Sequence, residues 1–174
     1  MATVRLSEEI KLYNQLAWRN DPKIMQFTRQ SDYISPEECS AWIHGLIGDT
    51  KRRFYGIYTD VDEDQVGTCG FSSIDNYAGT AEFSMLIGPE HQKKGYGRLA
   101  MYELLKHGFL NLGLNKIWGE VMEHNHRAMD LDMKIGFVKE GYLKDQYYKN
   151  GKLIGAWRIA MWREAFDTLA WAQS

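Results

Sequence analysis

The sequence lacks the features that mark membrane, secreted, metal-binding or nucleic-acid-binding proteins. No apolar run reaches the roughly 18 residues of a transmembrane helix, and the N-terminal segment lacks the apolar core of a signal peptide. Cys39 and Cys69 are the only cysteines, and their spacing fits no metal site. The formal net charge of −2 gives no general attraction to nucleic acid or to an anionic membrane. We therefore expect a cytoplasmic protein with reduced cysteines, no metal, and no nucleic-acid or membrane partner.

Two common phosphate-binding motifs are also missing. The dinucleotide fingerprint G-x-G-x-x-G would need a third glycine where Ala100 stands, and the P-loop pattern G-x-x-x-x-G-K-[ST] does not occur. Internal repeats, low-complexity segments and linkers are absent as well. The length of 174 residues therefore predicts a single domain over residues 1–174.

A glycine-containing loop is the strongest positive feature. It follows the apolar run 83–87 and precedes a helical pattern, so unpaired backbone N–H groups and the helix dipole can meet an anion there. Its two glycines permit a close backbone approach, and its three cations can neutralise a pyrophosphate. The loop consists of Gln92, Lys93, Lys94, Gly95, Tyr96, Gly97 and Arg98.

Apolar periodicity and turn residues predict an α+β domain. Helices are expected after caps at Ser7 and Ser35, and over 98–112, 127–135 and 164–172. Strands are expected at 53–58, 66–74, 80–87 and 117–122, followed by a hairpin of 142–148 and 153–162. The acidic segment 60–64 is expected to be a solvated loop. Because a helix separates 80–87 from 117–122, these two strands should be parallel.

The pattern Q/R-x-x-G-x-G in the loop resembles the coenzyme A pyrophosphate loop of the GNAT superfamily of acetyl-CoA-dependent N-acetyltransferases. Asn125 and Ala128, followed by Lys-Ile-Gly-Phe at 134–137, are similar to a second signature of that family. The resemblance covers about residues 52–162. It implies the GNAT fold: a mixed, mostly antiparallel central sheet, splayed between its fourth and fifth strands, with helices on both faces. Spermidine N-acetyltransferases, ribosomal-protein N-terminal acetyltransferases and nucleotide-sugar amino N-acetyltransferases are all similar to parts of the chain.

The same resemblance implies acetyl-CoA as the acetyl donor, with coenzyme A as product. In this family the pantetheine arm enters the splay, here between 80–87 and 117–122. The backbone groups of Leu86 and Ile87 would then bind its amides, in the manner of strand addition. Asn125 would bond the same arm, although capping the helix that follows is an equally natural role.

Amine acetylation needs a proton acceptor, because an alkylammonium with a pKa near 10.4 is mostly charged at pH 7. Glu82 is the leading candidate, since it matches a catalytic glutamate of several GNAT branches and shares a strand face with Ser84. The alternative for Glu82 is a solvated strand carboxylate. Glu123 and His124 are the reserve candidates for the base.

The departing thiolate needs a proton or independent stability. Many GNAT enzymes use a tyrosine seven residues after the helix-opening asparagine, but Asp132 stands there in this sequence. An aspartate with a reference pKa near 3.9 is a poor donor at pH 7 unless burial raises that pKa. Asp132 could be such a shifted acid, the thiolate could leave unaided, or activity could be reduced. We expect unaided departure, with Tyr102, Tyr142 and Tyr147 as alternative donors.

Substrate contacts are expected from the first two helices with their connection 20–35, and from the C-terminal hairpin. The candidates are cations and aromatics suited to phosphates, carboxylates or sugar faces: Arg19, Arg29, Tyr33, Tyr147 and Trp157. Nothing in the sequence selects among a polyamine, an amino sugar and a peptide N-terminus. The predicted function is transfer of an acetyl group from acetyl-CoA to a primary amine by direct attack. The alternative is a non-catalytic acyl-CoA-binding or regulatory module, and a homodimer is compatible with either.

Overall fold

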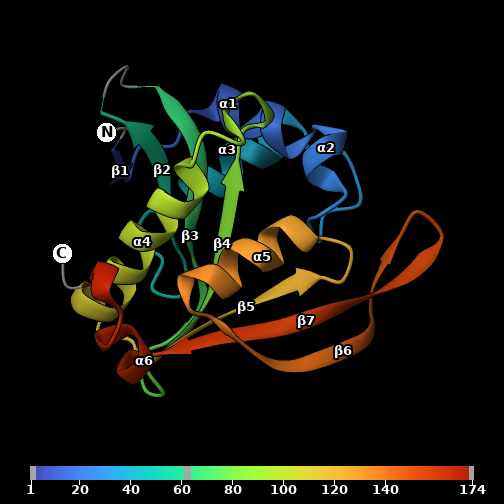
Figure 1. Ribbon diagram of the computed structural model, residues 1–174. Helices are drawn as coiled ribbons and strands as arrows, with labels where there is room; N and C mark the ends of the chain where they lie inside the picture. Colours follow the sequence, from blue (N-terminus) through green and yellow to red (C-terminus); the bar gives the residue numbers. More distant parts are fainter. Residues whose placement is uncertain (1–2, 61–63, 173–174) are drawn as a thin grey trace.

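The computed structural model describes residues 3–60 and 64–172, which form one seven-stranded sheet in the order β1-β2-β3-β4-β5-β7-β6 (Figure 1). The strands are β1 (Val4–Ser7), β2 (Arg53–Thr59), β3 (Gln65–Asp75), β4 (Thr80–Ile87), β5 (Lys116–Met122), β6 (Val138–Lys149) and β7 (Lys152–Trp162). Neighbouring strands are antiparallel apart from β4 and β5, which run parallel. The predicted parallel crossover and the α+β class are therefore confirmed.

The sheet opens between β4 and β5. The two strands pair only at Thr80↔Lys116, Ala81↔Ile117 and Glu82↔Trp118. Beyond Glu82, β4 continues against β3 as far as Ile87, while β5 continues against β7 as far as Met122. The strands consequently diverge, as Figure 1 shows, and the expected splay of the GNAT fold is confirmed.

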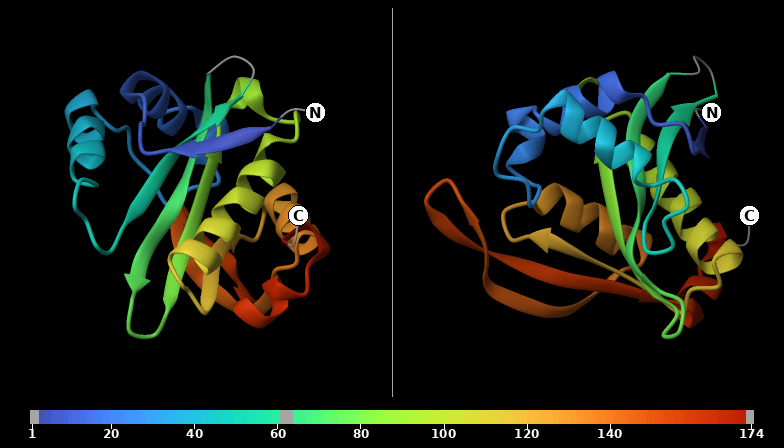
Figure 2. Two further views of the ribbon diagram at one scale, coloured as in Figure 1. Left: turned by 90° about the vertical axis from the view of Figure 1, so that its left-hand side faces the viewer. Right: turned by 180° about the vertical axis from the view of Figure 1, so that it is seen from behind.

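Helices cover both faces of this sheet (Figure 2). The helices are α1 (Leu12–Arg19), α2 (Pro22–Met25), α3 (Pro36–His44), α4 (Tyr96–Lys106) with a π-helical end (His107–Asn111), α5 (His126–Ile135) and α6 (Arg163–Asp167), with 3₁₀ turns at Pro89–His91 and Ala170–Ala172. One face carries α1 to α3, where the Thr68 hydroxyl donates to the side-chain oxygen of Gln15 at 2.7 Å. The other face packs against α4, α5 and α6.

The hydrophobic core lies on the α4–α5–α6 side. Phe71 from β3 and Ile117 from β5 are fully buried there, in one cluster with Leu104 of α4 and Phe166 of α6. Ala81 belongs to this core, and Phe83, Met85 and Ile87 pack against it. This confirms the predicted alternation, which leaves Glu82 and Ser84 on the opposite face.

Two predictions about helix ends were wrong and one was confirmed. Ser7 does not cap a helix, because it closes β1, a short strand that pairs with β2, and α1 starts only at Leu12. The expected terminal helix over 164–172 is interrupted and forms α6 and a separate 3₁₀ turn. Ser35 does cap α3, in a reciprocal capping box with Glu38.

Three further observations bear on the predicted class of protein. Cys39 and Cys69 are both free and buried, and burial raises the pKa of the Cys69 thiol. Among residues 3–60 and 64–172, no helix is long and apolar enough to cross a membrane. In the same residues, no group of three or more side chains is arranged to hold a metal ion.

Of the predicted acidic loop 60–64, residues 61–63 lie outside the described residues.

Candidate functional site

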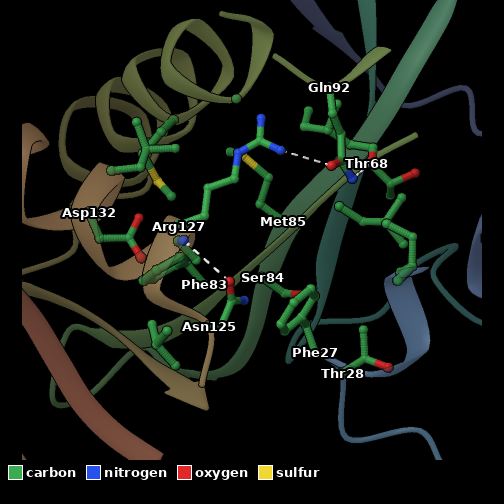
Figure 3. Close-up of a pocket in the computed structure, with 18 of the residues that line it drawn as sticks. Phe27, Thr28, Thr68, Phe83, Ser84, Met85, Gln92, Asn125, Arg127 and Asp132 are labelled. Carbon is green, nitrogen blue, oxygen red and sulfur yellow. Dashed lines mark hydrogen bonds between the residues drawn. The ribbon is translucent and has the colours of Figure 1, made fainter. Parts of the chain in front are cut away.

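A cleft of about 740 Å³ begins where β4 and β5 separate. Its walls come from the outer half of β4, the start of α4, the start of α5 and the loop after α2 (Figure 3). The volume lies within the roughly 300–1,000 Å³ of known ligand pockets. The opening of the sheet therefore creates a binding site between elements that the sequence places far apart.

The glycine loop forms one end of the cleft. Gly95 takes the N-cap position of α4 with φ of +87°, a conformation that side chains rarely adopt, and no side chain caps the helix. The N–H groups of the first turn are thus available to an anion. Lys93 and Arg98 line the cleft. Lys94 is exposed outside the lining, so its contact with a ligand remains a prediction.

Gly97 keeps space free at the same end. A Cβ atom there would meet Leu131 and Ile87 at 3.6 and 3.7 Å, which are ordinary contacts. The protein's own packing therefore does not require glycine at this position. The missing side chain instead leaves a cradle open at the start of α4, as a pyrophosphate of coenzyme A would need.

Gln92 connects three parts of the cleft. Its amide nitrogen donates to the carbonyl of Ile87 at 3.1 Å, and its amide oxygen accepts from Arg127 of α5 at 3.0 Å (Figure 3). Arg127 thereby crosses the cleft and adds a cation near the glycine loop. This arginine was not predicted from the sequence. The sequence feature that could have indicated it is its position in the first turn of α5, the helix that Asn125 opens.

The open edge of β4 differs by one residue from the predicted one. The Ile87 carbonyl lies on the open side, where Gln92 reaches it. The Leu86 carbonyl points to β3 instead. Its oxygen lies so close to Gly67 of β3 that a Cβ atom added there would collide with it. In an antiparallel ladder these orientations alternate, so Met85 shares the orientation of Ile87. The backbone of Leu86 therefore faces β3, contrary to the expectation, whereas Met85 and Ile87 present theirs to the open edge of β4.

Asn125 caps α5, which was one of its two expected roles. Its side-chain oxygen accepts from the N–H of Ala128 at 3.3 Å (Figure 3). The residue also lines the cleft, and its amide nitrogen makes no hydrogen bond to the described residues. A bond from this nitrogen to a pantetheine arm remains a prediction.

Asp132 lies two turns further along α5, and its carboxyl group points into the cleft (Figure 3). Only 4% of the residue is exposed. Burial raises the pKa of this carboxyl from 3.8 to about 7, and no charge or hydrogen bond from the described residues offsets that effect. Asp132 thus meets the condition under which an aspartate can donate a proton near neutral pH.

Glu82 stands at the point where the strands part, in a cluster of charged groups. It is 7% exposed, forms an ion pair with Arg29, and accepts a bond from the Ser72 hydroxyl at 3.4 Å. Arg29 also contacts Glu120 of β5 at 3.3 Å. The alternative of a solvated strand carboxylate at position 82 is therefore wrong.

Glu120 is the second buried carboxylate of this cluster. Arg158 donates to it at 2.6 Å, and the Tyr147 hydroxyl donates to its other oxygen. Burial alone would raise the pKa of Glu120, but these hydrogen bonds outweigh burial and lower it. Burial and the Glu120 carboxylate raise the pKa of Tyr147. Glu120 and Arg158 were not predicted from the sequence. Glu120 lies two residues after Trp118, the β5 residue that pairs with Glu82, and therefore on the same face of β5 as Trp118.

The two reserve candidates for the base differ. Glu123 does not line the cleft; it accepts from the Tyr142 hydroxyl at 2.6 Å and from the Gly155 N–H at 3.1 Å, and these bonds lower its pKa. His124 lines the cleft, but its Nε2 lies 3.0 Å from the Gln26 carbonyl and its ring stacks on Phe27. Of the two reserve candidates, His124 alone is a lining residue of the cleft.

Several predicted aromatic contacts lie elsewhere. Tyr33 is 69% exposed and outside the cleft lining. Tyr102 stacks on Trp171 with ring centroids 4.2 Å apart, and Tyr142 packs against Trp157. Of the candidate tyrosines, Tyr147 alone contacts the charged cluster within the described part of the chain.

Arg19 and Arg29, the two predicted cations, both line the cleft. The Arg19 Nε donates to the side-chain oxygen of Gln30 at 2.8 Å. Burial lowers the pKa of Arg19, and the smaller, opposite effect of Cys39 does not cancel this decrease. No carboxylate of the described residues lies within ion-pair distance of Arg19. Of these two guanidinium groups, that of Arg29 is ion-paired and that of Arg19 has no ion-pair partner among the described residues.

Comparison with known proteins agrees with this geometry. The model of the acetyltransferase (GNAT) domain family matches residues 5–138. The chain is 31% identical to a spermidine N(1)-acetyltransferase of Vibrio cholerae over 133 residues, covering 76% of each protein. It is 31% identical to the acetyltransferase PseH of Campylobacter jejuni over 125 residues, covering 72% of this chain and 74% of that protein.

A solved structure is similar over almost the full length. The crystal structure of the Vibrio cholerae spermidine N-acetyltransferase in complex with CoA and spermine superposes with a TM-score of 0.87. The two chains are 28% identical, with 94% of this chain and 96% of that chain covered. This chain belongs to the GNAT acetyltransferase family and is an N-acetyltransferase that takes its acetyl group from acetyl-CoA and passes it to an amine.

Proposed function

We propose that the acetyl group passes directly to a primary amine held beside Glu82, without an acetyl-enzyme intermediate. The observation that carries this proposal is the buried carboxylate of Glu82 at the point where β4 and β5 separate. Neither cysteine supports a covalent route, since Cys39 and Cys69 are buried and neither lines the cleft. A single displacement between bound donor and amine is then the simplest chemistry for the site.

The residues present fit acetyl-CoA, which supplies the thioester that the amine attacks. We assign the pyrophosphate to the glycine loop, where free N–H groups, the open position at Gly97 and the cations Lys93, Arg98 and Arg127 converge. Along the open edge of β4, the carbonyls of Met85 and Ile87 would accept from the pantetheine amides, with Ile87 using the lone pair that Gln92 does not occupy. Asn125 supplies an amide donor on the opposite wall.

Glu82 is assigned as the proton acceptor. An amine attacks only as the free base, and a buried carboxylate beside it can take the proton directly or through water. Arg29 and Ser72 already bond the Glu82 oxygens, which fixes the orientation of the carboxylate relative to the cleft. Positioning of this kind raises the efficiency of a general base.

Asp132 is assigned as the proton donor to the departing sulfur. It stands in the cleft on the α5 wall, while Glu82 stands on the sheet, so the two carboxyl groups serve different parts of the reaction. With a pKa of about 7, the acid is half protonated at neutral pH and lies within about two units of a thiol pKa near 8.5. This arrangement favours assisted departure of the thiolate over the unaided departure expected from the sequence.

The family assignment leaves the acceptor amine open. Relatives of this chain include enzymes named for spermidine and the enzyme PseH. A thiol-release assay over polyamines, amino sugars, nucleotide-linked amino sugars and short peptides tests the proposed function. Turnover on at least one class supports it. Tight acetyl-CoA binding without turnover on any class would favour the non-catalytic module instead.

The Gly97→Val variant tests the assignment of the pyrophosphate end. Acetyl-CoA at 100 times its Kd should stabilise the wild type by about 2.7 kcal/mol, measured as a thermal shift. The valine side chain should occupy the cradle and remove that shift, while the Tm without ligand stays close to the wild type because nearby contacts are ordinary. Gly95→Val is a poorer test, since its φ of +87° would also strain the fold.

Gly141→Val is the matched control for this experiment. Gly141 lies on β6, where an added Cβ atom would meet nothing within 4 Å and the backbone φ is not left-handed. Valine at this position should therefore change neither the fold nor the shift. A Gly97→Val protein that keeps the full shift would show that coenzyme A binds elsewhere.

A further inference from the structure

The amine end of the cleft is the part around Glu82 and Glu120, where the acceptor amine is proposed to bind. Its two carboxylates are already ion-paired within the protein. Glu82 and Glu120 share Arg29, and Glu120 is also paired with Arg158. Two negative charges thus meet two positive charges. Arg158 is further held over the ring of Trp118, with its guanidinium carbon 4.0 Å from the ring centroid. Within the described residues, the cluster offers no unpaired carboxylate to a second ammonium group of a substrate.

Arg29 is held in this position by an anchored loop. Lys149, only 6% exposed at the end of β6, donates to the backbone carbonyls of Met25, Thr28 and Gln30. The far end of the loop is fixed by Asn20, whose side chain bonds both the N–H and the carbonyl of Ile34, at 2.9 and 2.8 Å. These contacts hold the backbone on both sides of Arg29, and its half-exposed guanidinium is placed by Glu82 and Glu120.

Arg19 provides a complementary feature beside this loop. Its Nε donates to Gln30, the chain neighbour of Arg29. Arg19 lines the same cleft and also a smaller adjoining pocket with Glu38 and Cys39, and it has no ion-pair partner among the described residues. A partly desolvated cation without a counter-charge is costly, and an anionic ligand would offset that cost. Guanidinium groups bind carboxylates and phosphates through two parallel hydrogen bonds, so Arg19 is suited to such a group.

We propose that the acceptor is an amine that also carries a carboxylate or phosphate group, with Arg19 binding the anion and Arg29 excluding polyamines. The inference rests on the proposed function and names the substrate class for the same site. A polyamine would bring one or more further ammonium groups to a cluster that already holds Arg29 and Arg158. An anionic amine would place its reactive nitrogen near Glu82 and its charge near Arg19.

Matched pairs of acceptors test the inference in the wild type. The pairs are phosphoethanolamine with ethanolamine and tyrosine with tyramine, with spermidine as the polycation. We expect kcat/KM to be at least 10-fold higher for the anionic member of one pair than for its partner, and lowest for spermidine. The two pairs separate a phosphate from a carboxylate preference. Spermidine as the best acceptor would overturn the inference while leaving the proposed function intact.

Variants assign the effect to residues. Arg19→Gln should raise KM for the anionic amine at least 10-fold and leave KM for the uncharged partner within about twofold. Arg29→Gln should lower KM for spermidine, because the carboxylate pair loses one of its cations. Arg5→Gln is the control. Arg5 lies on β1 over the ring of Tyr58 of β2, and it does not line the cleft. An unchanged preference in Arg19→Gln would overturn the role of Arg19.

Binding measurements keep the inference decidable if chemistry fails. Calorimetry with the coenzyme A-loaded protein compares phosphoethanolamine with ethanolamine in the wild type and in Arg19→Gln. Tighter binding of the phosphate compound that is lost in Arg19→Gln supports the inference. Equal binding of the two compounds overturns it. Absence of turnover on every amine would count against the proposed function alone.

Discussion

Replacing Glu82 with glutamine is expected to lower kcat for amine acetylation by about 100-fold or more at pH 7, the usual contribution of a general base. Glutamine has the same shape and can still accept a bond from Arg29, but it cannot take a proton. Acetyl-CoA binding should be unchanged, because the glycine loop lies at the other end of the cleft. Steady-state kinetics and the acetyl-CoA thermal shift, measured on the same preparation, separate the two effects.

The pH dependence identifies the cause of the loss. Free amine becomes abundant as pH approaches the pKa of the acceptor, so the deficit of Glu82→Gln should shrink at high pH. Glu120→Gln is the matched control, because it removes a neighbouring carboxylate of the same cluster without removing the proposed base. Equal losses in both variants, constant with pH, would make the effect electrostatic. Unchanged turnover in Glu82→Gln would transfer the role to His124 or to solvent.

Local patterns were sufficient to predict most of the elements around the site. The bounds of β4 were predicted without error, because its ends carry clear turn signals and its faces alternate. The capping box at Ser35 and the start of α5 were also local signals. The short strand β1 was missed, since four residues give too little periodicity and their role depends on pairing with β2.

The charged cluster could not be predicted in the same way. Glu82 was predicted as a candidate base from a single strand, but its contact with Arg29 spans 53 positions and that of Tyr147 with Glu120 spans 27. Lys149 reaches carbonyls more than 100 positions away. Such contacts depend on how the hairpin and the α2 loop meet, and no local pattern contains that information. The sequence therefore predicted Glu82, Arg29 and Tyr147 as separate candidates, but neither their pairing nor the participation of Glu120 and Arg158.

Asp132 illustrates a second limit, since burial decides its chemistry. From the sequence alone an aspartate is expected to be ionised at neutral pH, whereas the folded protein raises its pKa from 3.8 to about 7. Between these two values the folded protein holds a proton that the unfolded chain has released. The stabilising contribution of this group to the free energy of unfolding is therefore fully present below about pH 4. It is lost as pH rises through about 7.

Asp132→Asn should accordingly make the protein more stable at high pH. Asparagine approximates the protonated carboxyl group and does not ionise. Between pH 5 and pH 9 the stability advantage of the variant should grow by about 3 kcal/mol, since two pH units of unequal proton binding correspond to that amount. Urea unfolding at several pH values measures this gap. Asp130→Asn, an exposed neighbour on α5, is the control and should show no such growth.

The same variant decides how the thiolate leaves. If Asp132 donates the proton, Asp132→Asn should lower kcat by about 100-fold with intact acetyl-CoA binding, while its stability rises. Wild-type kcat should then fall as pH rises through about 7, because the acid form of Asp132 is lost, and this decline should be absent from the variant. A small effect on kcat together with the pH-dependent gain in stability would mean that Asp132 is buried but not used, and that the thiolate leaves unaided. A gain in stability together with a loss of activity in Asp132→Asn would instead show that the buried carboxyl group destabilises the fold but is needed as the proton donor.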